Sequence, residues 1–102
     1  MKHYYCWAIS FIFSLGVLSA QEIQQIDSIN AILVQNSSLK TDSLLVVFEN
    51  NLKAAEQLDY KKGIGEAYKN IATIYGYEAE SKKRVEYNLK AIRIFEENDL
   101  KP

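Results

Sequence analysis

Side chains with obvious catalytic or metal-binding chemistry are scarce in this chain of 102 residues. The only cysteine and the only histidine, Cys6 and His3, both lie within the first twenty residues. Once residues 1–20 are set aside, as argued below, no thiolate or imidazole remains to bind a metal or to form a nucleophile pair. The sequence therefore predicts no disulfide, no metal site, no cofactor and no Ser-His or Cys-His catalysis.

Paired carboxylates are the remaining groups that could catalyse a reaction, as a general acid and a general base. Glu78 with Glu80 and Glu96 with Glu97 lie close together in the sequence. Neighbouring carboxylates at a turn or a helix end are usually solvated, so we expect no catalytic residue and no enzyme. Gly63-Ile64-Gly65 lacks both the spacing and the preceding strand of a phosphate-binding loop.

The first twenty residues resemble an export signal. Lys2 and His3 precede an apolar run from Cys6 to Leu18, and the small residues Ser19 and Ala20 follow it. The run is shorter than the roughly 20 residues that a helix needs to cross a bilayer. We therefore predict a signal peptide at 1–20 and a periplasmic or secreted chain, 21–102, without stable membrane insertion after cleavage. An uncleaved membrane anchor is the alternative, and the position of Cys6 does not suit a lipid anchor.

The overall composition is that of a globular protein. Hydrophobic residues make up 48% of the chain and charged residues 25%, which disfavours a disordered chain. Because the formal net charge is only −1, no basic field gathers phosphates, and we expect no nucleic-acid partner. The short basic run Lys82-Lys83-Arg84 is interpreted as a solvated helix face.

Apolar residues recur at helical spacing throughout the exported part, and no strand pattern is present. The pattern predicts an all-α fold with helices at 22–35, 42–58 and 82–97, and another helix on the stripe from Ile64 to Tyr75. Thr41, Asp42 and Ser43 are candidate N-caps of the second helix. The stripe of the third helix consists of Ile64, Ala67, Tyr68, Ile71, Ala72 and Tyr75.

The second and fourth helices are related by a shift of forty residues. Glu56 matches Glu96, Asp59 matches Asp99, and Lys61 matches Lys101. An internal period of this size, with two helices in each unit, is typical of an α-solenoid. We therefore expect two antiparallel helix hairpins, stacked on each other.

Residues 65–97 resemble a tetratricopeptide repeat (TPR). The matching positions are Tyr68, Ile71, Ala72, Tyr75 and Ala91, and the departures from the family pattern are Arg84, Asn88, Ala79 and Glu96. The resemblance implies a clear repeat at 64–97 and a poorer one at 22–58, with small residues where helices cross closely. Residues 54–64 are similar to the junctions between repeats in bacterial sensor and regulator proteins.

The resemblance also implies a function. TPR proteins form a concave surface that binds a peptide or a helix of another protein. The positions that it assigns to this partner-binding surface are Glu66, Lys69, Asn70, Thr73 and Tyr77, although a solvated face is the alternative for each one. A second interpretation is a sensory input region of a membrane-bound histidine kinase or transcriptional regulator.

Five tyrosines lie between Tyr60 and Tyr87. We interpret Tyr68 and Tyr75 as core residues, and Tyr60, Tyr77 and Tyr87 as residues of either a partner contact or the packing between repeats. Two hairpins provide little core, and the open face of the fourth helix is expected to expose Ile92, Ile94 or Phe95. We therefore expect that the chain either pairs with itself or with a partner through that face, or is the amino-terminal part of a longer exported sensor.

Overall fold

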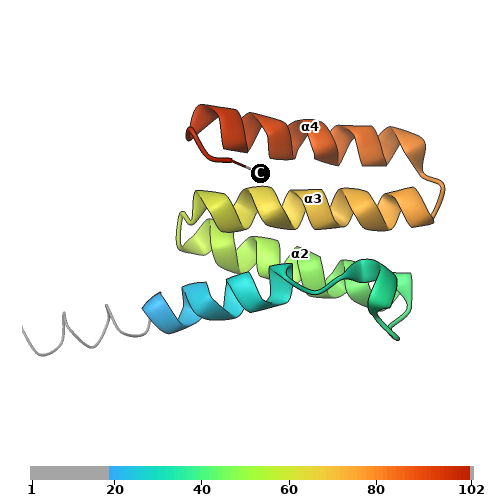
Figure 1. Cartoon of the computed structure of the whole chain (residues 1–102), viewed down its shortest axis with the longest axis horizontal. Coiled ribbons are helices and arrows are strands. Elements are labelled where there is room, and N and C mark those ends of the chain that lie inside the picture. Colours follow the sequence, from blue (N-terminus) through green and yellow to red (C-terminus); the bar gives the residue numbers. More distant parts are fainter. Residues whose placement is uncertain (1–18, 102) are drawn as a thin grey trace, which may run out of the picture.

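The structure is a computed structural model that describes residues 19–101, and these residues form four helices and no strand (Figure 1). Residues 19–30 are helical, a 3-10 turn η1 spans Val34–Asn36, and three α-helices follow: α2 (Thr41–Gln57), α3 (Lys61–Tyr77) and α4 (Ser81–Glu97). The prediction of an all-α fold is confirmed for this part of the chain. Most of the expected signal peptide, residues 1–18, lies outside the described residues.

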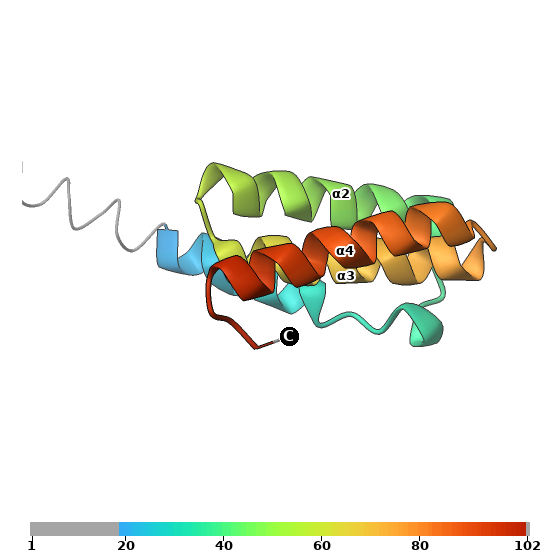
Figure 2. The same ribbon diagram turned by 90° about the horizontal axis from the view of Figure 1, so that it is seen from above.

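Successive helices run in opposite directions (Figure 1). The helix at 19–30 and α2 lie on one side of α3, and α4 lies on the other side. Seen from above, α2 follows one edge of the molecule and the segment that contains η1 follows the opposite edge (Figure 2). Within residues 19–101, no helix combines the length and the apolar character that crossing a membrane requires.

One type of turn ends each of the helices α2, α3 and α4. The turn residues Asp59, Ala79 and Asp99 have positive φ angles of 51°, 58° and 52°. The N–H of the residue after each one donates to a carbonyl oxygen in the last helical turn, from Tyr60 to Ala55, from Glu80 to Tyr75 and from Leu100 to Phe95. These bonds satisfy carbonyl groups that a helix end leaves without partners. The turn at Asp99 therefore has the same geometry as the turns that lead into α3 and α4.

The predicted boundaries of α2 and α4 are accurate to within one residue, and those of the other helices are not. The first helix was expected to continue to residue 35 but ends at Asn30. After Asn30 the chain is no longer α-helical, and this path places Val34 in the core, where it is 8% exposed. Leu33, which follows Asn30 at helical spacing, is 56% exposed. α3 begins at Lys61, three residues before the expected stripe, because the preceding turn is short.

The predicted N-caps of α2 were also wrong. The N-cap residue is Lys40, and no side chain caps the helix. Thr41 instead donates its hydroxyl to the carboxylate of Glu78, just beyond the end of α3. The side chain of Thr41 therefore contributes to a contact between helices.

The core is built around α3, which contacts α2, α4 and η1. One cluster joins Val34 with Leu44, Phe48, Ile71 and Ile74, and a second joins Ile26 with Ala55 and Ile64. Burial of the predicted stripe is confirmed at Ile64, Ala67, Ile71 and Ala72, whereas Ile74, only 1% exposed, was missed.

Asparagine side chains attach the helix at 19–30 to its neighbours. Buried Asn51 donates to the carbonyl oxygen of Ile26 at 3.1 Å, and Asn30 donates to the carbonyl oxygen of Gly63 at 3.1 Å. Asn70 donates to the carbonyl oxygen of Asn30 at 3.0 Å. Buried polar groups are costly unless they are paired, so these bonds favour one position of this helix over others.

α4 approaches α3 closely at Gly65. An ideal Cβ atom at Gly65 would lie 2.6 Å from Cε1 of Phe95, so only glycine leaves room for this ring. Phe95 is therefore only 4% exposed, which corrects its expected place on the open face. Of the residues expected there, Ile92 is 49% exposed and Ile94 is half-buried.

Candidate functional site

Two adjoining pockets form a groove along the boundary between α3 and α4, called here the α3–α4 groove. The first has a volume of about 380 Å³, and the second about 400 Å³. Asn88 lines both pockets, so they adjoin at this residue. The first pocket is lined by Ala72, Thr73, Gly76, Tyr77, Arg84 and Asn88, and the second by Lys69, Asn88, Ala91, Ile92, Phe95, Glu96 and Leu100.

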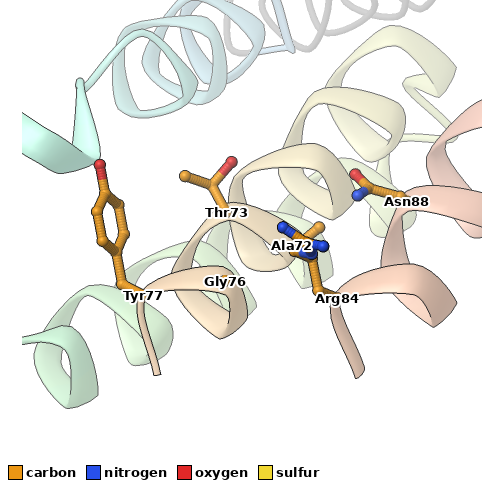
Figure 3. Close-up of a pocket in the computed structure, with 6 residues that line it drawn as sticks. All are labelled: Ala72, Thr73, Gly76, Tyr77, Arg84 and Asn88. Atoms are coloured by element: carbon orange, nitrogen blue, oxygen red, sulfur yellow. The ribbon is translucent and has the colours of Figure 1, made fainter. Parts of the chain in front are cut away.

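The first pocket is the polar end of the groove. Thr73 and Tyr77 extend from α3, and Arg84 and Asn88 extend from α4 (Figure 3). The hydroxyl of Thr73 donates to the carbonyl oxygen of Lys69 at 3.0 Å and keeps its lone pairs as acceptors. Arg84 is exposed and takes part in none of the ion pairs among residues 19–101. Its guanidinium group is therefore free to bind a carboxylate through two parallel hydrogen bonds.

The second pocket is the apolar end. Ala91 and Phe95 are both 4% exposed and form its base, while Ile92 forms an exposed wall. Leu100 closes the end, where its N–H donates to the carbonyl oxygen of Phe95 at 2.8 Å. Lys69 and Glu96 provide one charge of each sign. This end has the composition of a pocket that accepts an aliphatic or aromatic side chain.

The five residues predicted to bind a partner all lie on α3, but they do not all reach this groove. Lys69, Thr73 and Tyr77 line it. Glu66 lines a separate pocket of about 280 Å³ beside the helix at 19–30, and its carboxylate lies 3.8 Å from the amine of Lys69. Asn70 is turned toward the helix at 19–30, where its amide donates to Asn30.

Sequence reasoning missed the half of the groove that α4 provides. Arg84 was interpreted as part of a solvated basic run and as a departure from the repeat pattern, and Asn88 only as a departure, yet both line the polar end. Their forty-residue equivalents on α2 are Leu44 and Phe48, which are buried against Ile71 of α3. An arginine and an asparagine at positions that are apolar in the first unit were the signal that this face of α4 is not packed like that of α2.

A tyrosine cluster lies on the opposite flank of α4. The ring of Tyr87 lies 5.5 Å from that of Tyr75 and 6.0 Å from that of Tyr68, measured between centroids. The amine of Lys90 lies 4.7 Å from the centroid of Tyr87, and that of Lys83 lies 5.1 Å from the centroid of Tyr75. Burial raises the pKa of Tyr75. Packing thus uses Tyr87, while Lys83 of the basic run stays exposed beside the ring of Tyr75.

Tyr60 closes the turn between α2 and α3 and packs against the cluster around Ile26. Its hydroxyl donates to the carboxylate of Asp27 at 2.8 Å. Burial, followed by this hydrogen bond, raises the pKa of Tyr60 to about 12. Tyr60 is therefore a packing residue that holds the helix at 19–30 in place.

The described residues include no group of three or more acidic, histidine or cysteine side chains that could hold a metal ion. The arrangement on α3 and α4 instead offers hydrogen-bond donors and acceptors next to an apolar pocket. In comparisons with protein-family models, curated proteins and solved structures, the chain matches none of them.

Proposed function

We propose that this chain is a TPR-like interaction module, exported to the periplasm or secreted, that binds a segment of a partner protein in the α3–α4 groove. The proposal rests mainly on the groove itself, in which an apolar pocket adjoins a polar pocket that contains a free guanidinium group. The alternation of helix direction, the repeated turns and the buried Ala72 and Ala91 also favour stacked helix hairpins.

The two ends of the groove suggest the chemistry of the bound segment. An apolar side chain would occupy the pocket over Phe95, and a carboxylate would pair with Arg84. Eight residues of α4 separate Arg84 from Ile92, which corresponds to about 12 Å along a helix. The two groups of the partner would then lie about eight residues apart in a helix, or about four residues apart in an extended segment.

The test is to select peptides from a random library on the wild-type chain and then to measure their affinity for variants by fluorescence anisotropy. Arg84→Glu and Ile92→Asp should each weaken binding by about tenfold or more. Lys53→Glu, on an exposed position of α2, changes the charge by the same amount as Arg84→Glu and should leave binding unchanged. Peptides whose affinity is equal for all three variants would contradict the proposal.

A second candidate function is a sensory input region of a membrane-bound signalling protein. The observation that favours it is the turn at Asp99, which repeats the geometry of the turns that lead into α3 and α4. The encoding gene provides the test. A membrane-spanning helix followed by a kinase or DNA-binding domain, encoded directly downstream, would support this candidate, and a stop codon after residue 102 would contradict it.

A further inference from the structure

A stripe of exposed side chains runs along α4 next to the groove. Its members, called here the α4 stripe, are Lys82, Val85, Leu89, Ile92 and Glu96. They follow alternating steps of three and four residues, the spacing that places side chains along one seam between two packed helices. The three apolar members are 52%, 55% and 49% exposed, respectively, and they are consecutive in the stripe. Such a row on one helix is typical of an interface.

The equivalent face of α2 provides a comparison for the α4 stripe. The forty-residue equivalents of the apolar members on α2 are Leu45, Glu49 and Leu52. Leu45 and Leu52 are half-buried and, like Tyr75 and Tyr87, pack against the core cluster of Leu44 and Phe48. α4 thus has a leucine, Leu89, where the covered helix has a glutamate. The α4 stripe is therefore both more exposed and more apolar than the equivalent face of α2. This is unexpected for a face that contacts only water.

The charges of the stripe identify the occupant. Its amino-terminal end is basic, at Lys82, and its carboxy-terminal end is acidic, at Glu96. If two copies of α4 pair in opposite directions about a two-fold axis near Leu89, Lys82 of each copy meets Glu96 of the other. On the flank of the stripe, the same two-fold axis brings Glu86 of each copy close to Arg93 of the other. Parallel pairing would instead bring like charges together.

These charges are available for such contacts. Lys82, Arg93 and Glu96 take part in none of the ion pairs among residues 19–101. Glu86 lies 3.6 Å from Lys90 in an exposed pair, which is weak and easily exchanged. We infer that the α4 stripe binds a second copy of this chain, in an antiparallel and two-fold symmetric arrangement. Each contact between unlike residues then occurs twice, as in other isologous interfaces.

This inference goes beyond the proposed function, and the two can fail separately. Ile92 and Glu96 belong to both the groove and the stripe, so variants at these positions do not distinguish them. Leu89 belongs only to the stripe, and Arg84 lines only the groove. Leu89→Asp should therefore prevent dimerisation, and Arg84→Glu should leave it unchanged.

The decisive experiment exchanges charges between copies of the full chain and measures mass by sedimentation velocity over a range of concentrations. Lys82→Glu alone and Glu96→Lys alone each convert two attractive pairs into two repulsive ones, and each should raise the dimer dissociation constant by about tenfold. A mixture of the two variants restores both attractive pairs, so the heterodimer should form with a dissociation constant close to that of the wild-type dimer. Circular dichroism checks that both variants remain helical.

A crosslinking experiment tests the position of the axis. In a Cys6→Ser background, a short thiol-reactive linker should join the cysteine introduced by Leu89→Cys to the same cysteine of the second copy. A cysteine introduced by Ser28→Cys, exposed on the helix at 19–30, is the control and should not be joined. A chain that remains monomeric over the whole range of concentrations would overturn the inference. Association that is unaffected by Leu89→Asp, or that the mixed variants do not restore, would do the same.

Discussion

Two glycines of α3 should respond in opposite ways to the same substitution. Gly65 faces the ring of Phe95, where an added Cβ atom would come within 2.6 Å of Cε1 and 2.7 Å of Cζ. Gly76 faces only the flexible stem of Arg84, 3.1 Å from its Cδ atom. Neither glycine has a positive φ angle, so the backbone permits alanine at both positions. The outcome therefore depends on whether the neighbouring side chain can move.

The magnitudes follow from this difference. Inside a helix, alanine has a helix propensity that is up to about 1 kcal/mol more favourable than that of glycine. At Gly76 the stem of Arg84 can rotate away, so Gly76→Ala should stabilise the fold by about 0.5–1 kcal/mol. At Gly65 the buried ring is held in place, and overpacking costs about 1–3 kcal/mol. Gly65→Ala should therefore destabilise the fold by about 1 kcal/mol net, and its Tm should lie roughly 10 °C below that of Gly76→Ala.

Thermal and urea unfolding, followed by the helical signal in circular dichroism, measure both variants under the same conditions. Phe95→Leu removes the ring edge that the new methyl group would meet. In that background, Gly65→Ala should cost less free energy of unfolding than it does in the wild-type chain. Equal stabilisation by the two alanine substitutions would refute the close contact between α3 and α4 at Gly65.

Three further predictions concern polar and turn residues. Asn51→Ala removes the buried hydrogen bond to Ile26 and should lower the free energy of unfolding by about 1–3 kcal/mol in urea titrations; no loss would contradict this bond. Ala79→Gly relieves a positive φ angle of 58° and should raise the free energy of unfolding by about 1 kcal/mol, and a lower value would argue against this turn. Because the pKa of Tyr60 is raised to about 12, folding stabilises its protonated form, and this contribution is lost as the pH rises from 10 to about 12. Tyr60→Phe should therefore show a smaller decrease of Tm over this range than the wild-type chain, and an equal decrease would refute this assignment.

The helices could be predicted because their apolar residues follow a strict period and glycine and proline are few. The end of the first helix could not be predicted, because its own pattern favours continuation through Leu33. Contacts with the distant residues Leu44 and Phe48 decide instead that Val34 is buried. Such a contact overrides local preference and leaves no trace in the local sequence.

The candidate site was predictable only on the helix whose pattern is clearest. The TPR resemblance assigned Lys69, Thr73 and Tyr77 to a partner-binding surface, and all three line the α3–α4 groove. The contact of Asn70 with Asn30 was not foreseen, because polar pairs between helices have no period that a single sequence reveals. The burial of Phe95 was missed for a related reason, since it depends on a glycine of another helix.

The central claim is that the α3–α4 groove binds a segment of another protein. Its most direct test is a nuclear magnetic resonance titration of the isotopically labelled chain with a selected peptide, which maps the backbone amides that shift on binding. The claim predicts the largest changes at Thr73, Tyr77, Arg84 and Ile92, at the two ends of the groove. Changes centred on the exposed face of α2, around Lys53, would contradict it.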